Sequence, residues 1–227
     1  MKCDKKTMRK ELLALAEGEY QKFTQALNPG IANMLGVRLP ALRKLADKIH
    51  KENPQEYLAD TKIKYAEELM LEAMLICKQP FDIQTIKNFV PKINGWGICD
   101  TFCCGLNIKD SDKPALLRFI APYIDSENEF DVRFCAVTLL AIFDDPQYAK
   151  RALALLKRFK HEGYYAKMGV AWAVSVFFVK ARSETLALLQ NNKFDKFTHN
   201  KSIQKICESF RVSKDDKQLV RSLKKSL

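Results

Sequence analysis

Glycine and proline are scarce in this chain, with only 8 of each among 227 residues. Loop-rich β proteins and low-complexity chains need more of both, because turns and linkers depend on them. Alternation of apolar and polar residues, the pattern of a half-buried strand, also holds for no more than a few residues at a stretch. These absences argue against a β fold and favour a helical one.

Long apolar runs are missing as well. The longest extends from Met168 to Val179, far short of the roughly 20 residues that cross a bilayer. We therefore expect a buried helix there and no membrane segment. The N-terminus is charged and has no apolar segment behind it, so no secretory leader is expected.

Histidine is rare, and the 7 cysteines are odd in number. Most of them lie in apolar helical stretches, where a free thiol behaves as a small hydrophobic group. This usage suits a reducing compartment and predicts a cytoplasmic protein. Cys99 and Cys103 are four residues apart, but no histidine lies near them and no second pair has ligand spacing. We expect no metal and no cofactor.

Positive charge is in excess, with a formal net charge of +11 and a pI of about 9.3. Such an excess favours polyanionic partners, through counterion release from phosphates or attraction to anionic lipid. A basic surface that only keeps the protein in solution is an equally open interpretation.

Helical periodicity runs through almost every long segment. The predicted helices cover residues 6–27, 39–51, 64–78, 96–107, 113–122, 128–143, 146–158, 163–180, 184–190, 198–209 and 213–225. Ser183, Thr198 and Ser213 are the expected N-caps. The connections are short, which predicts antiparallel hairpins in a single domain, residues 1–227.

Three chemically distinctive residues recur at a regular spacing. Trp96, Arg133 and Trp172 are 37 and 39 residues apart. A period near 40 residues with two helices per repeat is typical of HEAT-type arrays. We therefore predict an all-α fold, an α-solenoid of HEAT-like antiparallel helix pairs whose equivalent helices line a concave face.

Residues 96–107 separate into two faces on a helical wheel. One face carries Trp96, Asp100, Cys103 and Asn107. The opposite face, expected to anchor the helix in the core, carries Ile98, Phe102 and Leu106. Gly97, beside the tryptophan, leaves room for close approach. An aromatic ring, an acid and an amide are thus presented together.

Each candidate also has a purely structural interpretation. A tryptophan most often packs in the core, which applies to Trp96 and Trp172. Asp100 can pair with an arginine from the next hairpin. Arg133 lies in an apolar helix, so it must be paired, extend its charged end to solvent, or await an anion.

The four residues together match one kind of chemistry. Indole faces hold a cation or a planar base. A carboxylate beside them can stabilise a cationic sugar transition state or orient a water molecule. A nearby guanidinium can clamp a phosphate. Excision of an alkylated purine from DNA needs all three functions.

Four segments carry a resemblance to a known family: MLGVRLPALRKLADKI, WGICD, DVRFCAVTLL and YYAKMGVAWAVS. Over roughly residues 34 to 210 the chain resembles the bacterial DNA-alkylation-repair glycosylases built from HEAT-like repeats, the AlkD type. The resemblance implies that Trp96 and Asp100 are the catalytic pair, that Arg133 contacts the DNA backbone, and that Trp172 completes an aromatic cleft. It also implies removal of cationic N3- and N7-alkylpurines without a metal and without drawing the base into a deep pocket.

The chain departs from that family at two places. The family has an uninterrupted, minor-groove helix before the LGV turn, whereas this chain reads TQALNPGIANMLGV. Pro29 and Gly30 should stop a helix at or before Asn28, so this element is expected to be shortened or missing. Ser175, three residues after Trp172, replaces a basic residue of the family, which removes a phosphate contact.

Three functional hypotheses follow. The first is a monofunctional glycosylase that acts on alkylated double-stranded DNA. It is expected to be a monomer and to have no membrane partner. The second is a catalytically silent HEAT-repeat relative that binds DNA non-specifically. The third is a HEAT-type adaptor for an acidic protein, with both tryptophans in its core.

Overall fold

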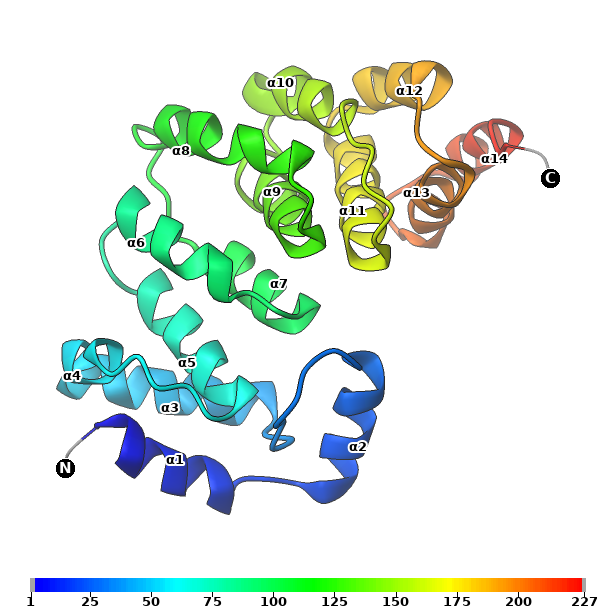
Figure 1. The fold of residues 1–227 in the computed structure, drawn as a ribbon. Coiled ribbons are helices and arrows are strands. Elements are labelled where there is room, and N and C mark those ends of the chain that lie inside the picture. The colour runs from blue at the N-terminus through cyan, green and yellow to red at the C-terminus, as the bar shows by residue number, and fades with distance from the viewer. Residues whose placement is uncertain (1–2, 226–227) are drawn as a thin grey trace. The chain divides into compact units, whose positions relative to one another are not determined.

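All regular secondary structure in the described residues, 3–225, is helical in the computed structural model (Figure 1). These residues form 14 α-helices and two short 3-10 helices, with no strand among them. Within the same range, no helix is both long enough and apolar enough to cross a membrane. The predicted all-α class is confirmed.

The chain divides into two compact units, and each is described by itself. Unit 1 ends at Asn107. It contains α1 (Lys5–Ala14), α2 (Gly18–Leu27), α3 (Leu39–Glu52), α4 (Pro54–Ala59), α5 (Ala66–Cys77), α6 (Ile83–Phe89), η1 (Val90–Lys92) and α7 (Trp96–Gly105). Helices α3, α5 and α7 stack in chain order, while α1, α4 and α6 each pack against α5.

Unit 2 begins at Ile108. It contains α8 (Lys113–Ile120), η2 (Ala121–Asp125), α9 (Glu129–Ile142), α10 (Pro146–Leu156), α11 (Tyr164–Lys180), α12 (Arg182–Asn191), α13 (Lys196–Glu208) and α14 (Lys214–Ser222). Helices α9, α11 and α13 stack side by side, and α8, α10 and α12 cover them on one side (Figure 1). Sequential packing of this kind within each unit agrees with the predicted HEAT-like helix pairs.

Helix α11 includes the longest apolar run of the sequence. Its residues from Ala166 to Phe178 are mostly buried between α9 and α13. The prediction of a buried helix at 168–179 is confirmed. The reason is that a helix in the middle of a stack has neighbours on several sides, so it needs no polar face.

The prediction of one helix over residues 6–27 is wrong. Helix α1 ends at Ala14 and α2 begins at Gly18. Between them, the backbone N–H of Glu17 donates to the carbonyl oxygen of Gly36 at 3.2 Å. A long-range contact with a distant turn therefore interrupts a segment that local periodicity shows as continuous.

Other local predictions need correction. The structure adds the short helices α4 and α6, whose N-caps are Asn53 and Asp82. Ser213 caps α14 as expected. Thr198 does not cap α13, because the Asp195 carboxylate accepts the Thr198 N–H and hydroxyl instead. Ser183 does not cap α12 either; it lies inside that helix, which begins at Arg182.

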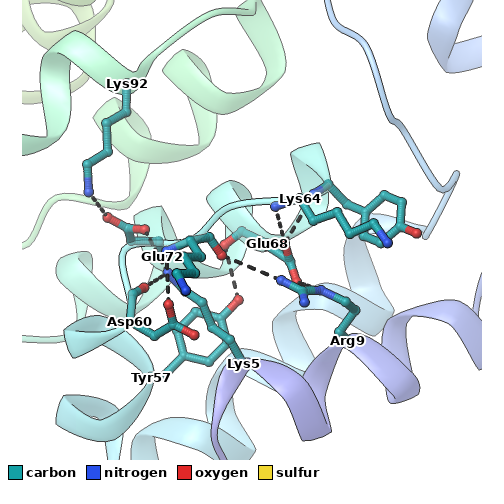
Figure 2. Close-up of polar contacts among 10 residues, drawn as sticks. Lys5, Arg9, Tyr57, Asp60, Lys64, Glu68, Glu72 and Lys92 are labelled. Carbon is teal, nitrogen blue, oxygen red and sulfur yellow. Dashed lines mark hydrogen bonds and ion pairs between the residues drawn. The ribbon is translucent and has the colours of Figure 1, made fainter.

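Helix α1 is tied to α5 by buried ion pairs (Figure 2). Arg9 pairs with Glu68, and the buried Lys5 Nζ lies 3.5 Å from Glu72, which also pairs with Lys92 of η1. A buried carboxylate without partners would destabilise the fold by several kcal/mol. The two acids of α5 therefore require α1 and η1 to lie where they do.

We predict that Gly36→Ala destabilises the protein by about 1–3 kcal/mol from backbone strain alone. Gly36 has φ = +78°, and an added Cβ would lie 2.5 Å from the backbone nitrogen of Gln21 on α2. Denaturant unfolding measures the change. Gly30→Ala is the matched control, because a Cβ there meets no described atom within 4 Å. Equal stability of the two variants would contradict this role for Gly36.

His199, a buried residue of α13, packs against Asn192 and the end of α14. Its Nε2 lies 2.8 Å from the Leu223 carbonyl oxygen, and the Asn192 amide nitrogen lies 3.0 Å from its Nδ1. Burial lowers the pKa of His199 below its usual 6.5. The neutral ring is therefore the form that the fold stabilises.

Because the folded-state pKa is the lower one, this contribution is complete above pH 6.5 and is lost as pH falls toward the folded value. The free energy of unfolding should decrease between pH 7 and pH 5, and His199→Gln should show a smaller decrease. Denaturant titrations at each pH test this. The same pH dependence in both proteins would refute it.

Candidate functional site

Helix α7 presents a stripe of exposed and partly exposed residues on the face opposite its buried residues. The stripe consists of Trp96, Gly97, Asp100, Thr101, Cys104 and Gly105. The buried face consists of Ile98, Cys99, Phe102 and Cys103. Trp96 and Asp100 therefore share one surface of the helix, one turn apart, as the wheel predicts.

Two members of the predicted face lie elsewhere. Cys103 is fully buried, with its sulfur 4.0 Å from that of Cys99. Asn107 lies beyond the end of the helix, which stops at Gly105. The wheel assigns these residues wrongly because it extends the helix too far and because the packing against α5 turns Cys103 inward.

The α7 stripe lines a pocket of about 660 Å³ that lies within unit 1. Helix α3 and helix α5 supply further walls, with Met70 and Met74 from α5. Helix α2 and the loop after it close another side. This volume is within the range of pockets that bind small organic molecules, roughly 300–1,000 Å³.

The loop from Asn28 to Arg38 exists because Pro29 and Gly30 end the preceding helix. Helix α2 ends at Leu27, so the predicted stop at or before Asn28 is confirmed. A helix is nevertheless present before the LGV turn. The loop then packs on the start of α7: a Cβ built on Gly95 would lie 2.2 Å from the side chain of Ile31.

Trp96 is fixed by the end of α2. Its indole Nε1–H donates to the carbonyl oxygen of Leu27 at 3.1 Å. Helix α2 has no buried residue of its own, so its position depends on such hydrogen bonds. Trp96 itself is partly exposed, and its ring lines the pocket. The Trp96 side chain therefore both holds the end of α2 and forms part of the candidate binding pocket.

Glu67, at the start of α5, organises the LGV turn. Its carboxylate accepts the backbone N–H groups of Leu35 and Gly36 at 2.8–3.0 Å, and that of Val37 at 3.4 Å. Only 3% of this residue is exposed. Charge-assisted bonds to backbone amides satisfy the buried acid and hold the turn against the pocket.

Two more groups define the chemistry of the pocket. The hydrogen bond from Lys78 lowers the pKa of the Asp47 carboxyl, which therefore stays an anion at neutral pH. Burial raises the pKa of the Cys77 thiol to about 12, so this thiol stays protonated. The pocket thus combines apolar thiol and thioether surface with ionised groups.

Arg133 and Trp172 lie on the neighbouring helices α9 and α11 of unit 2. Arg133 is only 6% exposed, and its Nη1 donates to the carbonyl oxygen of Tyr165 at 2.9 Å. Its side chain passes Gly169, where a Cβ would lie 3.1 Å from Cγ of Arg133. Trp172 is partly exposed on the next turn of α11.

Ser175 is buried, and its hydroxyl donates to the carbonyl oxygen of Trp172 at 2.7 Å. Its side chain is therefore directed into its own helix. The four sequence-predicted residues are divided between the units: Trp96 and Asp100 lie on α7 of unit 1, and Arg133 and Trp172 lie on α9 and α11 of unit 2.

Sequence reasoning missed Glu67, Thr101 and Cys104. The last two were detectable from helical spacing, because Cys104 lies four positions after Asp100 and Thr101 lies four positions after Gly97. Glu67 gave no signal, since an acid near a helix start is ordinary. Among the residues that the structure describes, no group of three or more His, Cys, Asp or Glu side chains is placed to hold a metal ion.

The chain matches a model of a known protein family. Residues 8–206 match the model of a protein family described as DNA alkylation repair enzyme. No curated protein sequence matches the chain. The family match spans both units and includes every candidate residue discussed above.

We predict that Glu67→Gln destabilises the protein by about 1.5–3 kcal/mol, because it removes a charge-assisted acceptor from three backbone amides. Hydrogen exchange at Leu35 and Gly36 should accelerate with it. Glu19→Gln is the control, since Glu19 forms an exposed pair with Lys22, worth less than about 1 kcal/mol. Unchanged exchange in the turn would show that Glu67 does not hold it.

Proposed function

The chain belongs to the DNA alkylation repair enzyme family, and on that premise we propose that it is a monofunctional DNA glycosylase that removes cationic N3- and N7-alkylated purines from duplex DNA. The observation that carries the proposal is the pairing of Trp96 and Asp100 on one face of α7, at the wall of a pocket. The excess of positive charge favours a nucleic-acid substrate.

The reaction is hydrolysis of an N-glycosidic bond. The bond between C1′ of the sugar and the purine nitrogen breaks, and its electron pair leaves with the base. An alkylated purine already carries a positive charge, so it departs as a neutral molecule and needs no general acid. Water adds to C1′ and loses a proton. A single carboxylate therefore suffices, in contrast to the acid–base pair of glycoside hydrolases.

Each candidate residue has a role in this scheme. The Asp100 carboxylate stabilises the developing cation on the sugar and orients the attacking water. Trp96 and Trp172 bind the cationic base through their electron-rich ring faces. Arg133 holds a backbone phosphate near the lesion. The hydrogen bond from Arg133 to the Tyr165 carbonyl oxygen limits the positions that its guanidinium can take.

A second candidate function is non-specific DNA binding without catalysis. The observations that favour it are the end of α2 at Leu27 and the inward direction of the Ser175 hydroxyl. A shorter minor-groove helix and a missing phosphate contact would lower the affinity for every DNA sequence. They would also reduce the salt dependence of that affinity. Neither observation affects the α7 pair, so we rank this candidate second.

We predict that the purified protein releases 7-methylguanine from alkylated duplex DNA and that Asp100→Asn lowers the single-turnover rate by at least about 100-fold. Asn keeps the size of the side chain but removes its charge. Asp110→Asn, at an exposed aspartate paired with Lys113, is the control and should react like the wild type.

Chromatography of the released bases measures the rate. No release at large excess of wild-type protein would overturn the proposal. Equal affinity for alkylated and unmodified duplex in the same preparation would then favour the second candidate.

A further inference from the structure

We propose that a groove between α8 and α10, within unit 2, docks an acidic, amphipathic helix of a partner protein. The groove has a volume of about 560 Å³, and its walls come from α8, η2, α10 and the residues just after α10. It contains none of the residues assigned to catalysis above. The inference therefore goes beyond the proposed function and does not depend on it.

The two walls of the groove are matching helical stripes. The wall from α8 and η2 consists of Pro114, Leu117, Arg118 and Ala121. The wall from α10 and the residues after it consists of Arg151, Ala154, Leu155 and Arg158. Both have the spacing i, i+3, i+4 and i+7, which is that of one helical face. Each residue of the second wall follows its counterpart in the first by 37 positions, so the walls are equivalent parts of successive repeats.

The apolar surface of the groove is in excess of what the core of unit 2 uses. Helices α8 and α10 bury other residues, such as Ile120 and Leu156. Ala121, Ala154 and Leu155 nevertheless keep exposed surface in the groove. An apolar side chain that enters from outside would gain by leaving water for this surface.

The charge around the groove has one sign. Three arginines line it: Arg118, Arg151 and Arg158. The segments that form the walls, 113–124 and 146–160, contain no aspartate or glutamate. Arg158 pairs with Asp125, but within the described part of the chain the guanidinium groups of Arg118 and Arg151 have no ion pair or hydrogen bond. Because both side chains are exposed, carboxylates of a partner can pair with them.

An amphipathic helix matches both properties of the groove. Its apolar face supplies side chains at i, i+3 or i+4, and i+7 for the space between the walls, and acids beside that face pair with the arginines. The wall from Pro114 to Ala121 has the length of two helical turns, roughly 10 Å. About two turns of the partner therefore fit. A DNA backbone offers phosphates to the arginines but has no apolar group that would occupy the groove.

Two variants test the groove, and each has a matched control. The double variant Arg118→Gln, Arg151→Gln removes two exposed cations from the rim. Its control, Arg211→Gln with Arg221→Gln, removes the same charge at exposed positions outside the groove.

Ala154→Glu places an acid in the groove, where it repels an acidic partner and takes up space. Its control is Ala187→Glu, because Ala187 is an exposed alanine of α12 that does not line the groove. All of these side chains are exposed, so the fold should tolerate the changes, and circular dichroism checks this.

The probe is a fluorescein-labelled peptide of about 15 residues, long enough to form a helix. It carries leucines at helical spacing on one face and glutamates on the flanks. One control peptide has the same composition in scrambled order, and the other has glutamine in place of glutamate. Fluorescence anisotropy at about 0.15 M salt, where long-range attraction is screened, measures the affinity for the full chain.

We expect saturable binding of the acidic amphipathic peptide, at least about tenfold tighter than that of either control peptide. The double variant Arg118→Gln, Arg151→Gln and the variant Ala154→Glu should each weaken it by at least about tenfold, and the control variants by less than about twofold.

No saturable binding of the acidic amphipathic peptide overturns the proposal. Equal affinity for the scrambled peptide, or an equal loss in the Arg211 and Arg221 control, reduces the effect to general charge and overturns it as well. If unmodified duplex DNA binds instead, and Ala154→Glu weakens it while Ala187→Glu does not, the groove is a nucleic-acid surface and not a protein-docking site. Base release plays no part in these measurements, so a failure of the proposed function leaves the test intact.

Discussion

The arrangement of unit 1 depends on the buried carboxylates of α5. Glu67, Glu68 and Glu72 lie within six residues of one helix, and each is satisfied by a different part of the unit. Burying an ionised acid is costly unless it is paired or hydrogen-bonded. The LGV turn, α1 and η1 are therefore constrained to meet α5. The pocket beside α7 has fixed walls because these constraints act together.

The helix break at Pro29 has a structural consequence that the sequence does not reveal. In the sequence it shortens an expected helix. In the structure, the loop from Asn28 to Arg38 packs on the start of α7 and closes the pocket on one side. Helix α2 has no buried residue, so hydrogen bonds to Trp96 and to the turn hold it in place. The position of α2 and the orientation of the Trp96 indole are thereby linked.

The candidate residues also differ in how much freedom they have. Arg133 is nearly enclosed between α9 and α11, and the absence of a side chain at Gly169 makes the space for it. The side chain of Arg133 therefore has little conformational freedom. Trp96, Asp100 and Trp172 remain partly exposed, which argues against the adaptor hypothesis with both tryptophans in the core.

By itself, the sequence determined the all-α class, most of the helices, the stop at Asn28 and the shared face of Trp96 and Asp100. These features follow from local periodicity and from the geometry of proline, which act over a few residues. Only the tertiary structure decided the break between α1 and α2, the inward turn of Cys103, the role of Glu67 and the existence of the pocket. Each of these depends on residues far apart in the chain, such as Glu17 with Gly36 and Trp96 with Leu27. A helical wheel or a spacing contains no information about such partners, because folding alone brings them together.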